Sequence, residues 1–373
     1  MRLLSAVIIF AIIYVVQKMV FSKNWRKGLA VSMGFSRNYI ECGEKACLLE
    51  TITNDKLLPL PVFHIKFAID RSLEFDDMNN SVVTDFYHRT DVFSLMGRQR
   101  VERSLSFTGT KRGIYSVPAA NILVKDFFLV SSYARSISPE AEIFVFPEKK
   151  KSVQYDLLFS GLMGDILSTR RLMTNDLMFR GVRDYMPYDR YRDINWKQSA
   201  RGTGLKTNIY DFSMDIEVRI LIDLDTDTMI RPEKLIEESI SIASSIALDL
   251  LRKNLSVSLE SNGTDKDERP VPAVPAGAEG SHILDIDRSL AAIEGSSFYE
   301  RFLDMVKNEM MRGSRNVHYI IISPYSKESL LSILDRMVKE GRSISMIVPY
   351  YNSLGYSPVR DYIRGWEVDI YGT

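Results

Sequence analysis

Apolar and alternating stretches divide the chain into segments of different structural type. Residues 3–16 are apolar without a charge, and residues 19–21 continue this character beyond Gln17 and Lys18. The Lys18 ammonium can reach the membrane surface on its aliphatic stem, so residues 3–21 approach the ~20 residues that cross a bilayer. We therefore predict a membrane anchor with a basic flank over residues 1–28, in contact with lipid through residues 3–21. A cleaved signal peptide is the alternative, but Arg2 alone is a short positive region and no small-x-small cleavage site follows.

Residues 29–147 show the pattern of short strands. Alternating or β-branched runs at 46–52, 62–69, 100–107 and 142–146 are separated by turn-forming residues. Short strands at this spacing, without a helical period, predict an antiparallel β-sandwich domain. Within it, residues 70–99 carry several Asp and Asn residues and are predicted as loop or a weak edge strand.

The remaining residues, 148–215 and 216–373, depart from this pattern. Residues 148–215 are predicted to be a connector; its first part, to about Asp176, has weak apolar spacing and is expected to be mobile with partial helix. In residues 216–373 an apolar strand at 218–224 precedes a helical stripe from Leu235 to Leu250, and strands then alternate with helices. This alternation predicts an α/β domain with a mostly parallel sheet covered on both faces, so the whole chain is α+β and multidomain. Residues 264–282, rich in Pro, Gly, Ala and charge, are predicted as a disordered loop.

Charge and cysteine content narrow the classes of partner. The 48 Lys and Arg residues equal the 48 Asp and Glu residues, so no net field favours nucleic acid, and we expect no nucleic-acid partner. Cys42 and Cys47 are the two cysteines, which is too few for a disulfide framework or a zinc site. The four histidines show no metal-ligand spacing.

Residues 180–206 concentrate arginines, aspartates and aromatic residues. Connectors favour Lys, Glu, Ser and Gly, whereas Arg and aromatic side chains are typical of fixed pairing and stacking. Arg183, Arg192 and Arg201 can each offer a planar fork to a carboxylate, with Asp184, Asp189 and Asp193 as the nearest acceptors. A catalytic role lacks a nucleophile or base here, so we predict a structural or interface role and not an enzyme.

The run G-V-R-D-Y-x-P-x-D-x-x-R-x-I-N-W-K-x-S-A-R, residues 181–201, resembles the signature of the bacterial "domain of unknown function 58" family. It matches without a gap and departs from the family at Asp184, where Glu is common, and at Tyr188, where Gly is common. Further similarities lie at 43–44, 54–61 and 112–115, and at Asp126-Phe127-Phe128-Leu129, where the family often has D-P-F-G-L. The signature and interface residues that we carry forward are Arg180, Gly181, Arg183, Asp184, Tyr185, Pro187, Asp189, Arg192, Asn195, Trp196, Lys197, Ser199, Ala200 and Arg201.

This resemblance implies a β-sandwich followed by a von Willebrand factor A-like domain. Relatives are commonly encoded beside MoxR-type AAA+ ATPases, so it also implies such an ATPase as a partner. The expected function is then a membrane-anchored protein-binding scaffold in the assembly or maturation of other proteins, with membrane or client proteins as further partners. Trp196 lies in the tightest part of the signature, and we expect its indole to be buried between two domains.

A second candidate site is the carboxylate cluster Asp223, Asp225 and Asp227, at the end of the apolar strand. Three alternate carboxylates there can hold a hard cation such as Mg²⁺. Asp223 and Asp225 also fit the D-x-D-x-T of phosphohydrolases as nucleophile and acid/base, which makes a Mg²⁺-dependent phosphohydrolase the alternative function. The resemblance favours instead a degenerate von Willebrand A-like site, metal-free or weak, because Asp225 and Asp227 replace its two serines and Ser323 stands where a distant Asp is expected. A plain helix cap gives the same metal-free outcome.

The membrane topology follows from the basic residues around the anchor. Lys18, Lys23, Arg26 and Lys27 outnumber the single Arg2 on the other side, which places residues 29–373 in the cytoplasm. A reporter enzyme fused after Thr373 should therefore show cytoplasmic activity. Activity of that fusion on the external side of the membrane would contradict this topology.

Overall fold

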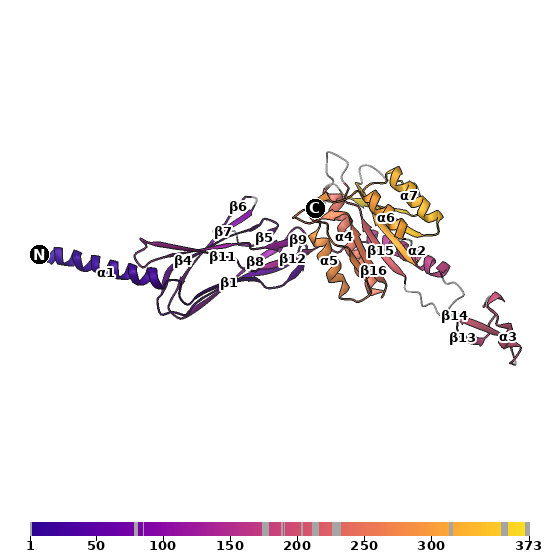
Figure 1. The fold of residues 1–373 in the computed structure, drawn as a ribbon, viewed down its shortest axis with the longest axis horizontal. Coiled ribbons are helices and arrows are strands. Elements are labelled where there is room, and N and C mark those ends of the chain that lie inside the picture. Colours follow the sequence, from indigo (N-terminus) through magenta and orange to yellow (C-terminus); the bar gives the residue numbers. More distant parts are fainter. Residues whose placement is uncertain are drawn as a thin grey trace. The chain divides into compact units, whose positions relative to one another are not determined.

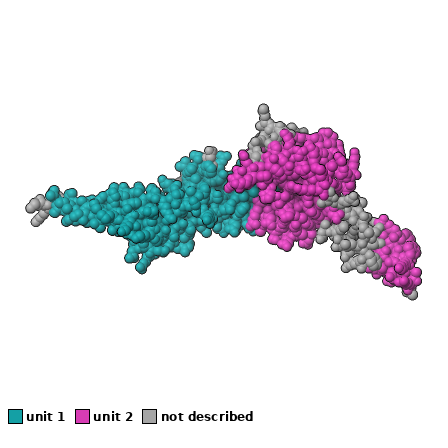
Figure 2. Space-filling model, in the orientation of Figure 1, with its two compact units in different colours: residues 1–148, 290–292 teal, residues 149–289, 293–373 magenta. Residues whose placement is uncertain are grey.

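The computed structural model describes residues 2–77, 81–84, 86–173, 179–187, 189, 191–202, 204–210, 216–225, 233–312, 316–351 and 357–369. These residues form two compact units, residues 1–148 with 290–292 and residues 149–289 with 293–373 (Figure 2). The α+β class is confirmed, with one N-terminal apolar helix and antiparallel, sandwich-like sheets in the first unit.

Helix α1 (Arg2–Asn24) begins the first unit (Figure 1). By length and composition it can cross a membrane, and most of its apolar side chains are exposed. Its last turns are different, because Phe21 and the following Trp25 are buried in the core of the β-sheets. Helix α1 is thus joined to the sheets through aromatic side chains.

Three sheets make up the rest of this unit. The first sheet contains, in order, β1 (Leu29–Phe35), β3 (Lys45–Asn54), β8 (Gln99–Gly109) and β5 (Leu73–Phe75). The second contains β11 (Ser132–Ile137), β10 (Ala120–Lys125), β4 (Leu60–Asp70), β7 (Phe86–Leu95) and β6 (Ser81–Val83). The third contains β2 (Tyr39–Glu41), β12 (Glu142–Phe146) and β9 (Gly113–Ser116). All pairings are antiparallel apart from β2 with β12. Alternate residues of β3 and β4 are buried, as expected for strands with one face on a core.

Strand β7 shows why residues 70–99 were predicted as loop or edge. It is ten residues long and lies inside its sheet, paired with β4 and β6. Its inward positions include Arg89 and Asp91, which are 1% and 0% exposed and pair at 2.8 Å. Charged residues at buried positions hide the alternation, so the prediction was wrong for β7, whereas β5 and β6 in the same range are short edge strands.

A buried glutamate lies beside this ion pair. Glu50 on β3 is fully buried, and burial together with the charge of Asp91 raises its pKa to about 8. Arg103, opposite Glu50 in the β3–β8 register, pairs with Asp91 at 2.9 Å. The raised pKa of Glu50 favours its neutral form, which limits the charge held in this core.

The second unit contains a six-stranded sheet that is parallel except at one edge. Its strands in order are β18 (Val274–Gly277), β16 (Ser256–Ser261), β15 (Glu217–Ile222), β20 (Val317–Ile322), β21 (Ser343–Tyr351) and β22 (Ile363–Val368). Outside this sheet, β17 (Gly263–Thr264) pairs with β19 (Glu294–Phe298). Strand β18 is the antiparallel member. It lies within residues 264–282, so that range is not wholly a loop: Val271 and Val274 are buried there.

Helices cover this sheet. They are α2 (Val153–Met173), α4 (Glu233–Arg252), α5 (His282–Ala292), α6 (Phe302–Arg312) and α7 (Glu328–Lys339). Helices α6 and α7 share a core with Leu221 of β15 and with alternate residues of β20, among them Tyr319. The structure differs from the prediction of partial helix in α2, which runs for 21 residues and buries Tyr155, Leu158, Leu162 and Ile166.

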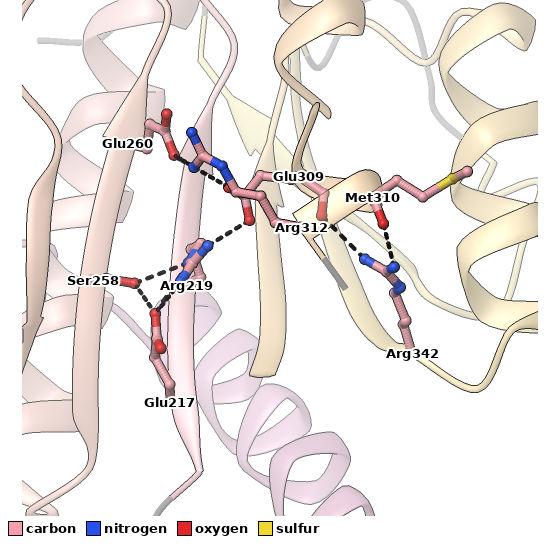
Figure 3. Close-up of polar contacts among 8 residues, drawn as sticks. All are labelled: Glu217, Arg219, Ser258, Glu260, Glu309, Met310, Arg312 and Arg342. Atoms are coloured by element: carbon pink, nitrogen blue, oxygen red, sulfur yellow. Dashed lines mark hydrogen bonds and ion pairs between the residues drawn. The ribbon is translucent and has the colours of Figure 1, made fainter. Parts of the chain in front are cut away.

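An ion-pair network joins α6 to the sheet on one face (Figure 3). Arg219 on β15 donates to Glu217 at 2.7 Å and to Glu309 on α6 at 2.5 Å. Ser258 on β16 donates to Glu217 at 2.6 Å, and Arg342 donates to the main-chain oxygen of Glu309 at 3.2 Å. Arg219 is thus the cation that neutralises two carboxylates.

Replacing Arg219 with Met should destabilise the protein by about 3 kcal/mol, because Glu309 is only 1% exposed and would lose the less exposed of its two cations. Arg312→Met is the matched control, since Arg312 also pairs with Glu309 but is 60% exposed. That change should cost less than about 1 kcal/mol. Urea unfolding of the detergent-solubilised protein measures both, and equal losses would contradict the assignment.

Candidate functional site

The signature residues fold into a β-hairpin with helical turns between its strands. Strand β13 (Phe179–Asp184) pairs antiparallel with β14 (Lys206–Tyr210). The 3₁₀ turn η1 (Tyr191–Asp193) and the one-turn helix α3 (Trp196–Ser199) lie between them in the sequence. A further bridge joins Ile194 to Thr207, and both of these side chains are buried.

A guanidinium–carboxylate pair closes the turn after β13. The two terminal nitrogens of Arg183 donate to the two carboxylate oxygens of Asp189 at 2.7 and 2.6 Å. The main-chain N–H of Met186 donates to the same carboxylate at 2.8 Å. Hydrogen bonds from Arg183 and Met186 lower the pKa of Asp189. The predicted fork of Arg183 is therefore confirmed, with Asp189 as its acceptor.

The other two predicted arginines form no bidentate fork with an aspartate among the described residues. Arg192 lies 3.6 Å from its neighbour Asp193, and Asp184 is paired with Lys206 at 2.6 Å. Arg201 is exposed and has no ion pair among the described residues. Within the described part, the signature therefore contains one bidentate arginine fork.

Small polar residues of the signature hold α3 against β14. Asn195 caps α3, since its side-chain oxygen accepts from the N–H of Gln198 at 2.9 Å, and its amide donates to Asn208 at 2.7 Å. Ser199 accepts from the main-chain N–H of Lys206 at 2.8 Å. These hydrogen bonds fix the backbone of α3 against β14.

The burial of Trp196 between two domains stays a prediction. Within its own hairpin, Trp196 is 66% exposed. The physical reason is the size of α3. Helix α3 has four residues, none of them buried, and contributes little to the interior of the hairpin. Ile194, just before α3, fills that interior and is 5% exposed. Tyr191, at 78% exposure, and the exposed Lys197 accompany Trp196.

The other signature residues differ in exposure. Gly181, Tyr185 and Asp189 are half-buried, and the Tyr185 hydroxyl donates to the main-chain oxygen of Asp189 at 3.3 Å. Pro187 and Ala200 are exposed. The side chain of Arg180 lies outside the described residues.

The carboxylate cluster lies in the second unit at the carboxyl ends of three parallel strands. Asp223 and Asp225 follow β15, Asn262 follows β16 and Ser323 follows β20. Ser323 donates to Asp223 at 2.6 Å, and the N–H of Asp225 donates to the other Asp223 oxygen at 2.9 Å. Asn262 donates to Asp225 at 2.7 Å, as does the N–H of Phe302 at 3.1 Å.

Both carboxylates are buried, at 4% and 7% exposure, and both are held by protein donors. Burial raises the pKa of Asp223 to about 7, although the hydrogen bond from Ser323 acts in the opposite direction. Among the described residues no group of three His, Cys, Asp or Glu side chains could hold a metal ion. Asp227 lies outside the described residues. Sequence reasoning located Asp223, Asp225 and Ser323 but missed Asn262, whose signal is its position directly after a strand.

Comparison with known proteins gives no family. No protein-family model matches the chain, and no curated protein matches it. Solved structures that resemble part of it include a non-cellulosomal cohesin from Archaeoglobus fulgidus, at 12% identity over 31% of this chain and 90% of that one, with a TM-score of 0.22. A CARDB domain from Pyrococcus furiosus matches at 11% identity over 30% of this chain and 94% of that one, with a TM-score of 0.19. A cohesin module from a Clostridium perfringens glycoside hydrolase matches at 10% identity over 30% and 97%, with a TM-score of 0.21. Scores this low support no inference about function.

Millimolar Mg²⁺ should change the melting temperature of the protein by no more than about 1 °C, because a ligand stabilises only when the native state binds it. Here a cation would have to displace the donors that Ser323 and Asn262 supply to Asp223 and Asp225. Thermal unfolding at pH 7.5 with and without Mg²⁺ is the measurement. A clear upward shift that is lost in Asp223→Ala would contradict this reading.

Proposed function

We propose that this chain is a membrane-anchored protein-binding scaffold of the domain of unknown function 58 family. In this proposal it acts in the cytoplasm with a MoxR-type AAA+ ATPase, in the assembly or maturation of other proteins. The observation that carries it is the exposure of Trp196, on a hairpin whose backbone is held by Arg183, Asp189 and Asn195.

The exposed residues of the hairpin have the composition of a binding surface. Trp, Tyr and Arg dominate the energetics of protein interfaces, because they combine a large contact area with a polar group. Here Trp196 and Tyr191 are exposed together with the cations Arg192, Lys197 and Arg201, and we call these five residues the signature face. An indole exposed to water adds no stability to the folded chain. The exposure of Trp196 on a turn with a fixed backbone therefore favours a role in binding a partner protein.

The second unit supports the family assignment indirectly. Its mostly parallel sheet is covered by helices and carries Asp223 at the carboxyl end of β15, where a von Willebrand factor A-like domain would have its first aspartate. In the proposal Asp223 and Asp225 are structural, because they are occupied by internal hydrogen bonds. The ATP chemistry is assigned to the partner.

Replacing Trp196 with Ala should weaken binding of the ATPase at least tenfold, which corresponds to about 1.4 kcal/mol. The free energy of unfolding should change by less than about 0.5 kcal/mol, since the side chain is exposed. Titration of a purified MoxR-type ATPase onto the full chain in nanodiscs measures binding, and urea unfolding measures stability.

Met311→Ala is the control, because Met311 is an exposed apolar residue of α6, at 75% exposure, outside the signature face. It should leave both quantities unchanged. Unaltered ATPase binding by Trp196→Ala would refute the assignment of the signature face, and a stability loss of several kcal/mol would restore a structural role for this tryptophan.

A further inference from the structure

One end of the first unit gathers the turns that surround the exit of α1. Asn54 at the end of β3 pairs with Leu29 at the start of β1 and donates through its side chain to the main-chain oxygens of Leu58 and Met96, at 3.0 and 2.8 Å. In the other sheet, Lys125 at the end of β10 pairs with Val62 near the start of β4. The turns at 55–59, 96–98 and 126–131 therefore lie at the same end of the sheets as the residues that follow α1.

The turn between β10 and β11 lies along α1. The Phe128 ring is 5.5 Å from that of Phe10 and 5.8 Å from that of Tyr14, and the Phe127 ring is 6.1 Å from that of Phe21. Phe10 and Phe21 are separated by ~16 Å along the helix, from its rise of ~1.5 Å per residue. The turn thus accompanies the apolar helix well beyond the point where α1 enters the sheet core.

The side chains of this turn are apolar and largely exposed. Phe127, Phe128, Leu129 and Val130 are 45%, 36%, 55% and 67% exposed. Leu57 and Met96, on the two neighbouring turns, are 74% and 68% exposed. We call these six residues the apolar rim. Basic residues lie close to the rim in sequence, with Arg26 and Lys27 after α1 and Arg98 after Met96 all exposed.

Four of the six main-chain N–H groups in the β10–β11 turn, residues 126–131, donate within the turn. The carboxylate of Asp126 accepts from the N–H groups of Val130 and Ser131 at 3.0 and 3.3 Å. The main chain of Asp126 pairs with Ser131 and Leu129, at 3.1 and 3.0 Å. A turn closed in this way can leave water at low cost, because few donors lose a partner in an apolar medium.

We propose that the apolar rim is a second membrane contact, in which the β10–β11 turn enters the bilayer beside α1 and the adjacent turns rest on its surface. This inference rests on the membrane anchor of the proposed function and adds to it a lipid-binding surface on the folded domain. The ring contacts select lipid as the occupant, because the turn is in contact with a helix that is long and apolar enough to cross a membrane. Arg26, Lys27 and Arg98 are then placed for the headgroups.

The contact has a consequence for the orientation of the domain. A single membrane helix joined by a flexible linker leaves its domain free to turn, whereas a helix and an inserted turn hold it at two points. The burial of Phe21 and Trp25 in the sheet core already removes the linker. The rim then holds the first unit in one orientation relative to the bilayer.

Nitroxide accessibility in the full chain tests the proposal. Single-cysteine variants at Val130, Val82 and Ile9 are made in a Cys42→Ser, Cys47→Ser background, spin-labelled and reconstituted in vesicles of phosphatidylcholine and phosphatidylglycerol. Val82 is the matched control, because it is a valine of similar exposure, 66%, on β6, which pairs with β7 at the end away from the rim. Ile9 on α1 reports the anchor itself.

The expected result is that labels at Ile9 and Val130 relax with oxygen, which partitions into lipid, while the label at Val82 relaxes with a water-soluble nickel chelate. If the Val130 label behaves like the Val82 label while Ile9 remains in lipid, the rim proposal is overturned and the anchor stands. If the Ile9 label is also in water, the anchor of the proposed function falls together with the rim.

Discussion

The fork of hydrogen bonds between Arg183 and Asp189 is the constraint on which the signature segment depends. It joins the end of β13 to a residue six positions later, and the same carboxylate accepts from the main chain of Met186. Because this pair and the Asn195 cap hold the turn, the hairpin needs no contribution from its largest side chain. Trp196 is left in water on a fixed backbone, which is the preorganisation that binding favours.

The two sets of aspartates in the chain illustrate opposite uses of the same group. Asp189 is held by a guanidinium, which lowers its pKa, whereas burial raises the pKa of Asp223 to about 7. Both serve to position backbone and neighbouring elements. Exposed aromatic, apolar and cationic side chains lie on the signature face and on the apolar rim. We therefore place the partner protein on the signature face and lipid on the apolar rim.

Much of the architecture could be predicted from the sequence because it depends on local periodicity. The apolar helix α1, the alternating strands and the helical stripe of α4 each show their pattern within one element. Strand β7 could not be recognised, since Arg89 and Asp91 occupy its buried positions and their neutralisation involves Arg103 on another strand. Asn262 comes beside Asp225 only through the pairing of β15 with β16, and the exposure of Trp196 depends on how short α3 is. The pattern of a single sequence does not show which distant strands pair or how long each element is.

The central claim is that the signature face touches a partner protein. The most direct test is photo-crosslinking in intact membranes, with a photoreactive phenylalanine analogue in place of Trp196 and, as control, in place of the exposed Tyr39 of the first unit. The account predicts a specific adduct with a MoxR-type ATPase from position 196 and none from position 39. No adduct from position 196, or equal adducts from both positions, would contradict it.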